Sequence, residues 1–110
     1  MDYGSLLEPP DKPQRTSGMF REIQDLVQAF ENALDPGKEV GFMFSSYGSG
    51  VMIVTDISYR DPELFIFRGF IDGKESVLIQ SKAQLNFLLT SENRPDTSPS
   101  RAPIGFSLGP

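Results

Sequence analysis

The sequence predicts an α+β fold, in which one N-terminal helix packs on a strongly bent antiparallel sheet of four or five strands that forms a small barrel. Apolar residues recur at helical spacing over residues 18–34, and short apolar segments separated by turn residues follow them. Seven of the nine prolines lie outside residues 19–90. We therefore expect one domain at residues 18–90, between a disordered arm at residues 1–17 and a Ser/Pro linker and tail at residues 91–110.

The helix is predicted from a regular stripe of apolar residues. Its members are Phe20, Ile23, Leu26, Val27, Phe30 and Leu34. Such spacing places them on one side of a helix, which is expected to cover one face of the sheet. Thr16 or Ser17 can cap the start, and Asp35-Pro36-Gly37 is expected to end the helix because Gly can reverse the chain.

Four strands are predicted from alternating or β-branched segments. They cover residues 40–45, 51–59, 64–71 and 76–80. Tyr47-Gly48-Ser49-Gly50 allows the first reversal, and Pro62 interrupts the second connection. Asp72-Gly73 predicts a two-residue hairpin turn, which requires positive φ at both positions.

Residues 81–90 fit two structures. Ser81 and Gln84 have the spacing of a helical capping box, and Leu85, Leu88 and Leu89 fit a helix face. A fifth strand is preferred because the apolar residues Ala83, Leu85, Phe87 and Leu89 alternate with their neighbours.

Strand periodicity returns in the tail at Ile104, Phe106 and Leu108. This segment could add itself to an open sheet edge, either its own or that of a neighbouring copy. The alternative is a tail that stays disordered to its end.

Composition excludes several classes of chemistry. The chain has no Cys and no His, which removes disulfides, thiolate nucleophiles, imidazole catalysis and the common zinc sites. We expect no catalytic residues, no metal, no cofactor and no enzymatic activity. The absence of a long apolar run and of a signal peptide predicts a cytoplasmic protein that does not contact membranes.

The formal net charge of −5 bears on the partners. Residues 19–90 hold six basic and ten acidic side chains. Since nucleic-acid binding depends on Lys and Arg that neutralise successive phosphates, RNA is a disfavoured partner. A compact ligand is more compatible with so few basic residues.

The segment order resembles that of the Sm-like small barrels, the fold of the bacterial RNA chaperone Hfq. Residues 77–81 and 85–89 look like the second signature block of that fold, in which two apolar strands flank a very short turn. Residues 40–72 are similar in length and order to the first block, with Gly50 and Asp56 near positions where it carries Gly and Asp. The resemblance implies a ring of subunits that pair edge strands and bind uridine- or adenine-rich RNA.

Two departures from the Sm-like pattern affect the RNA function more than the fold. Ser81-Lys82-Ala83 stands where that family has a His-containing turn, and the net charge is negative. Three further segments resemble a small bacterial and phage domain family of unknown function. They are Ala33-Leu34-Asp35-Pro36, Asp61-Pro62-Glu63-Leu64 and Pro103-Ile104-Gly105-Phe106.

Candidate ligand-binding residues are the basic, aromatic and glycine-loop residues of the predicted sheet: Arg68, Tyr47, Ser49, Tyr59 and Lys82. Arg68 interrupts an apolar strand, so it either faces solvent or takes an anion in a pocket between subunits. The tyrosines could stack on a base or pack in the core. Ser49 belongs to a glycine loop that could bind phosphate or simply form a hairpin.

A sheet this small is expected to pair its open edges with other copies. Candidate interface residues are Leu85, Phe87, Leu89, Ile104 and Phe106. The leading hypothesis is a non-enzymatic homo-oligomer that binds a small nucleotide-like ligand at subunit interfaces. The alternatives are an Sm-like RNA-binding ring and a bacterial or phage protein-interaction adaptor or inhibitor acting through its arms.

Overall fold

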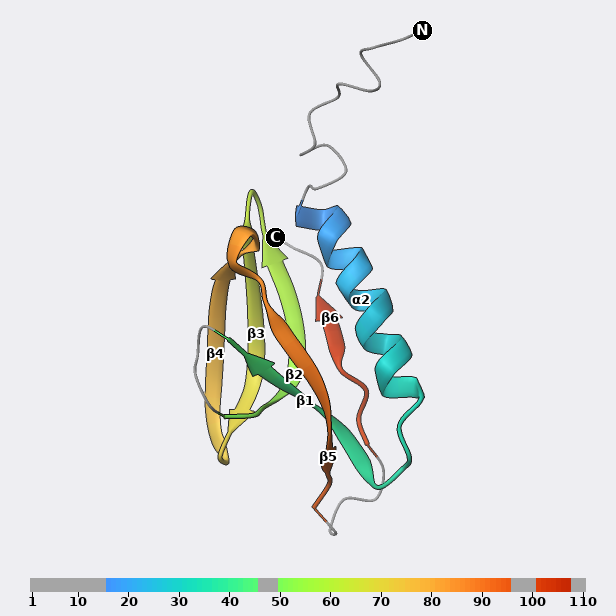
Figure 1. The fold of residues 1–110 in the computed structure, drawn as a ribbon. Helices are drawn as coiled ribbons and strands as arrows, with labels where there is room; N and C mark the ends of the chain where they lie inside the picture. The colour runs from blue at the N-terminus through green and yellow to red at the C-terminus, as the bar shows by residue number, and fades with distance from the viewer. Residues whose placement is uncertain (1–15, 46–49, 96–100, 108–110) are drawn as a thin grey trace, which may run out of the picture.

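A computed structural model describes residues 16–45, 50–95 and 101–107 of the chain (Figure 1). These residues form one α-helix, one short 3-10 helix and six strands. The elements are α2 (Thr16–Asn32), β1 (Lys38–Phe44), β2 (Met52–Arg60), β3 (Leu64–Ile71), β4 (Lys74–Ser81), η1 (Lys82–Gln84), β5 (Phe87–Asn93) and β6 (Gly105–Ser107). The predicted arm at residues 1–15, and with it most of residues 1–17, lies outside the described residues.

Five strands form an antiparallel sheet in the order β4-β3-β2-β1-β5. β1 pairs with β5 over its whole length, from Lys38↔Asn93 to Phe44↔Phe87. It pairs with β2 only at Gly41↔Ile53 and Phe42↔Met52. Beyond these pairs the two strands separate, and the sheet curls into a half-barrel. The predicted α+β fold with one helix on a bent antiparallel sheet is confirmed.

The core of the half-barrel is largely aromatic. Phe44 stands 4.8 Å from Phe67 between ring centroids, and Phe87 lies 5.3 Å from Phe42. At the end near the start of α2, the helix contributes Phe20, whose ring lies 4.9 Å from that of Tyr59. Burying such rings removes large apolar areas from water, and this favours the folded state.

The predicted helix stripe is confirmed for most of its members. Phe20 and Val27 are buried, and Ile23, Phe30 and Leu34 pack against the core. Leu26 does not follow this pattern because its side chain is exposed. Successive residues turn the helix by about 100°, which places Leu26 at the margin of the stripe and away from the sheet.

The hairpin between β3 and β4 has the predicted turn. Asp72 and Gly73 have φ values of 51° and 77°. The strands that flank them pair as Ile71↔Lys74. Positive φ at both central positions matches the right-handed twist of the paired strands.

Residues 81–90 combine features of both predicted structures. The capping signal at Ser81 is real, since its Oγ accepts a hydrogen bond of 3.1 Å from the N–H of Ala83, but it begins only the single turn of η1. The preferred strand is confirmed from Phe87 onward. β5 then continues three residues beyond Thr90, as far as Asn93.

The tail adds itself to the chain's own sheet, which was one of the alternatives that the sequence left open. Gly105–Ser107 forms β6, which pairs in parallel with β2 from Asp56 to Ser58. β6 therefore takes the border of β2 that β1 has left. Figure 1 shows α2 lying along β6 on the other side.

Candidate functional site

The three predicted ligand-binding residues that the structure describes lie at different places on the sheet. Arg68 lies on the outer face of the sheet, where its Nη1 donates to Ser58 Oγ at 3.3 Å and stands 3.9 Å from Asp56 Oδ2. Tyr59 points to the inner face and packs on Phe20. Lys82 is in η1, and its backbone N–H donates to the carbonyl of Glu63 at 2.7 Å.

Tyr47 and Ser49 lie outside the described residues. The glycine-loop part of the predicted ligand site therefore stays a prediction. A shallow hollow of about 270 Å³ lies beside Arg68 on the outer face, bordered by Thr55, Phe70 and Val77.

The predicted interface residues fall into two groups. Leu85, Phe87 and Leu89 belong to β5 or the turn before it and pack against the core from the inner face. Ile104 and Phe106 pack within the same chain, since Ile104 is buried and the ring of Phe106 lies 6.0 Å from that of Phe20. Ile104 and Phe106 therefore pack against the core of their own subunit.

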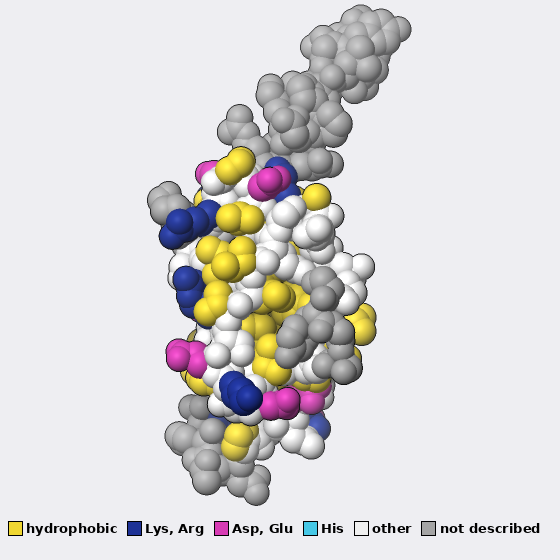
Figure 2. All heavy atoms as spheres, turned by 90° about the vertical axis from the view of Figure 1, so that its left-hand side faces the viewer, with side chains coloured by type: hydrophobic (Ala, Val, Ile, Leu, Met, Phe, Trp, Pro, Cys, Tyr) yellow, Lys and Arg dark blue, Asp and Glu magenta, His cyan; other side chains and the backbone are white. Residues whose placement is uncertain are grey.

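β4 and β5 form the two borders of the five-strand order, and both carry exposed apolar residues. β4 and β5 each have one neighbouring strand among the residues that the structure describes. The exposed residues on these strands are Val77 and Ile79 on β4 and Leu88 on β5. Figure 2 shows hydrophobic side chains gathered on the side of the molecule that carries β4. Open, apolar borders of this kind are prone to pair with another strand.

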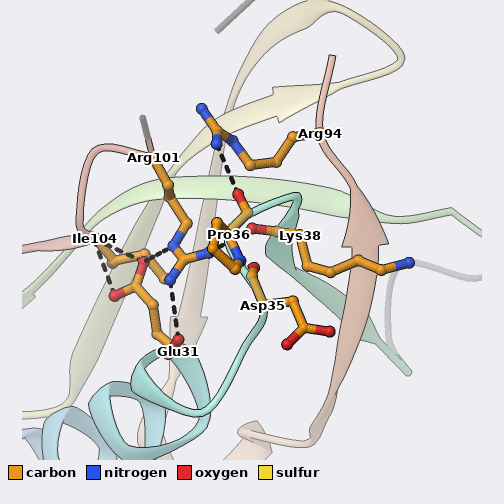
Figure 3. Close-up of polar contacts among 7 residues, drawn as sticks. All are labelled: Glu31, Asp35, Pro36, Lys38, Arg94, Arg101 and Ile104. Carbon is orange, nitrogen blue, oxygen red and sulfur yellow. Dashed lines mark hydrogen bonds and ion pairs between the residues drawn. The ribbon is translucent and has the colours of Figure 1, made fainter. Parts of the chain in front are cut away.

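A network of polar contacts joins the C-terminal segment to the end of α2 (Figure 3). Arg101 donates to the backbone carbonyls of Glu31, Asp35 and Lys38 at 3.2, 3.3 and 2.5 Å. Its Nε lies 3.7 Å from Glu31 Oε2. The last carbonyls of a helix lack partners within the helix, and a cation there is favoured by the helix dipole.

Glu31 completes this network from the helix side. Both of its carboxylate oxygens accept from the backbone N–H of Ile104 at 3.3 Å. The side chains of Glu31 and Arg101 are only 6% and 19% exposed. The buried carboxylate is thus paired and hydrogen-bonded, which is the condition for tolerating a charge in the interior.

A cavity of about 310 Å³ lies beside this network, where β1 and β2 separate, and we refer to it as the split cavity. Its lining includes buried apolar residues from three segments and polar residues at their ends: Val40, Val54, Ile104, Glu39, Thr55 and Arg94. Arg94 donates from Nη1 to the carbonyl of Pro36 at 2.8 Å and from its backbone N–H to that of Gly37 at 3.0 Å. Arg94 therefore joins the chain after β5 to the loop before β1 through one side-chain and one backbone hydrogen bond.

Sequence reasoning missed Glu31, Glu39, Arg94 and Arg101. A signal for the first was present, since Glu31 lies four residues after Val27 and in line with the apolar stripe of the helix. A carboxylate in that position calls for a buried partner. Within the described residues, no group of three or more Asp, Glu, His or Cys side chains could hold a metal ion.

A family of unknown function, DUF6173, matches the chain over residues 14–107. The chain belongs to this family. The matched residues begin just before α2 and end with β6, so the match includes the C-terminal segment of this chain. Neither the curated proteins nor the solved structures include a match to the chain.

These findings confirm the expectation of a family of unknown function. They also confirm the coarse feature of the Sm-like resemblance, a curled antiparallel sheet, whereas Sm-like identity stays a prediction. No helix in the described part of this DUF6173 protein is long and apolar enough to cross a lipid bilayer.

Proposed function

We propose that this protein is a non-enzymatic, homo-oligomeric binding protein whose subunits join by pairing β4 of one copy with β5 of the next. The observation that carries the proposal is the strand order β4-β3-β2-β1-β5, which leaves these two strands as borders. They are similar in length, at eight and seven residues. Pairing would satisfy the backbone groups of both borders at once.

The side chains of the two borders match on both faces of the sheet. On the outer face, β4 presents Val77 and Ile79, and β5 presents Leu88. On the inner face, Leu78 of β4 and the apolar residues of β5 pack toward the core. Neighbouring strands place such side chains within contact distance, so a seam between copies would bury apolar surface on each side.

This pairing joins two different surfaces of the subunit. A contact of that kind is head-to-tail, and repeated rotation either closes it into a ring or leaves an open filament. The Sm-like resemblance favours the ring.

The seam is also where we place the nucleotide-like ligand. Lys82 directly follows β4, so it would lie beside the adjoining copy and could meet an anionic group of the ligand. Arg68 lies on the outer face of β3, beside border strand β4, but it already contacts Ser58 and Asp56 of its own chain, which makes it a weaker candidate for this role.

The assembly is tested by native mass spectrometry of the purified full chain with two border variants, Ile79→Asp and Leu88→Asp. Each variant destroys one border and leaves the other intact. Leu26→Asp is the matched control, because Leu26 on α2 is 68% exposed, compared with 61% for Ile79 and 64% for Leu88. We expect the wild type and the control to be oligomeric, and each border variant alone to be monomeric.

Mixing the two border variants makes the test specific for head-to-tail pairing. An equimolar mixture contains one intact β4 border and one intact β5 border, so we expect heterodimers that grow no further. A symmetric β4–β4 contact would instead be lost in Ile79→Asp alone and preserved in Leu88→Asp. A wild-type protein that stays monomeric at high concentration would exclude the proposed assembly. The same spectra report any small molecule that copurifies.

The two other functions weighed for the sequence stay predictions. An RNA-binding ring would bind a uridine-rich oligonucleotide with an affinity that falls steeply as salt increases. An adaptor acting through its arms would lose its partner on removal of residues 93–110. That removal also deletes Arg101 and β6, so the folded state of the shortened chain must be measured alongside partner binding.

A further inference from the structure

The split cavity is formed within one subunit, so its properties do not depend on the proposed assembly. Its floor consists of Val40, Val54 and Ile104, all of which are buried. Above the floor, the edges of β1 and β2 are not paired with each other, because their ladder ends at Gly41↔Ile53. The tail that precedes β6 forms the remaining wall. The cavity is thus a gap in the half-barrel wall with an apolar floor and a polar rim.

The charges at this cavity are not all neutralised within the chain. Four charged residues line it, and two of them, Arg101 and Glu31, form the ion pair of the network described above. Neither Arg94 nor Glu39 forms an ion pair with another described side chain. One cation and one anion therefore line the same cavity without pairing.

Each of these two groups has spare binding capacity. The guanidinium of Arg94 makes a single hydrogen bond within the described residues, from Nη1 to Pro36, and its fork of five donors suits a carboxylate. Glu39 stands directly opposite Glu92 across the β1–β5 ladder. Like charges placed opposite each other in this way are destabilising, so a cation bound beside Glu39 would relieve the repulsion.

We propose that the split cavity binds a small zwitterion of the free amino-acid class. The carboxylate of the ligand pairs with Arg94, its ammonium group pairs with Glu39, and its side chain lies over the apolar floor. The volume of about 310 Å³ equals the space of about ten water molecules and lies at the low end of ligand pockets, so it suits a ligand of this size. A nucleotide is larger and carries no cationic group for Glu39.

The proposal is tested by titrating isotope-labelled full-length protein with each standard amino acid and following the backbone amides by NMR. We expect at least one amino acid to shift the signals of Val40 and Thr55 in a saturable manner. Its N-acetyl derivative and its amide derivative each lack one of the two charges. Both are expected to bind at least tenfold more weakly, because both charged groups of the cavity are used.

Variants assign the roles of the two charged residues. Arg94→Gln and Glu39→Gln are each expected to weaken binding at least tenfold, whereas the exposed controls Arg60→Gln and Glu75→Gln leave it unchanged. Ala102 lines the cavity and its side chain makes no hydrogen bond, so Ala102→Phe is expected to obstruct the cavity and to abolish the shifts. Dispersed amide spectra verify that each variant is folded.

Three results would overturn the proposal. The first is that no amino acid shifts these amides. The second is that a ligand with only one of the charges binds as tightly as the zwitterion. The third is that binding survives in Arg94→Gln, Glu39→Gln and Ala102→Phe. None of these results bears on the subunit count, so failure here is distinct from failure of the proposed assembly.

Discussion

The ion pair between Arg101 and Glu31 fixes the C-terminal segment to the end of α2. Both side chains are largely buried, so removal of one partner leaves the other charge without compensation. We predict that Arg101→Met lowers the free energy of unfolding by about 3–5 kcal/mol, measured by urea denaturation. Three backbone carbonyls lose their donor at the same time.

A second ion pair provides the control for this prediction. The side chain of Arg68 is 51% exposed, and exposed pairs contribute only about 0–1 kcal/mol. Arg68→Met should therefore change stability little. Adding Glu31→Gln to Arg101→Met should recover part of the loss, because it removes the uncompensated charge. Equal losses for Arg101→Met and Arg68→Met would contradict this account.

Gly69 occupies a position where a side chain has no room. A Cβ added there would lie 2.0 Å from the carbonyl oxygen of Ile53, which is backbone and cannot rotate away. Overpacking usually costs about 1–3 kcal/mol, and a backbone clash belongs at or above the upper limit. We predict that Gly69→Ala lowers the thermal midpoint strongly in calorimetry. Gly37→Ala, where nothing lies within 4 Å of the added atom, should leave it unchanged or slightly raised.

Among the elements, β6 closes the border of β2 that β1 leaves open. A chain that ends at residue 100 loses β6, Arg101 and the buried Ile104 together. We predict that it is less stable and that the amides of Asp56 to Ser58 exchange with solvent faster, as measured by hydrogen exchange. A chain that ends at Ser107 keeps every contact of the described tail and serves as the control. Unchanged exchange in the shorter chain would show that β6 does not protect β2.

Local patterns in the sequence predicted most of the elements but not the way in which the tail is used. Apolar periodicity and turn residues specify the helix, the first four strands and the Asp72-Gly73 hairpin, because they act over a few residues, whereas the fifth strand was only the preferred of two alternatives. β6 was only one of the alternatives for the tail. It pairs in parallel over three residues, and no local turn sequence predicts such a pairing. Its partner strand and its parallel direction depend on β1 separating from β2, which is a property of the folded sheet.

The candidate site was harder to predict from the sequence for the same reason. The network joins residues that are 70 positions apart, as in the bond from Arg101 to the Glu31 carbonyl. The split cavity is a gap in strand pairing and has no motif. Arg68 was conspicuous because it interrupts an apolar strand, yet the alternation of faces places it on the outside with Asp56 and Ser58. The charge therefore indicated which face of the sheet Arg68 occupies, and its role in binding a ligand stays a prediction.

For the molecule as a whole, the proposed assembly depends on the two border strands, β4 and β5. The seam that we propose is formed by backbone hydrogen bonds and by apolar residues such as Ile79 and Leu88. Salt screens interactions between exposed charges but does not weaken apolar burial. We predict that the oligomer persists when sodium chloride is raised to about 1 M, where the screening length is about 3 Å. Sedimentation velocity in low and high salt measures this, and dissociation by salt would indicate an interface held by charges instead.

The contacts between Arg101 and the end of α2 can form only late in protein synthesis. α2 and the first strands leave the ribosome long before residues 101–107, yet the carboxylate of Glu31 has no described cationic partner until Arg101 arrives. A nascent chain halted before that point should therefore remain sensitive to protease at the end of the helix. We therefore expect the C-terminal end of α2 to become fixed only after residues 101–107 have been synthesised.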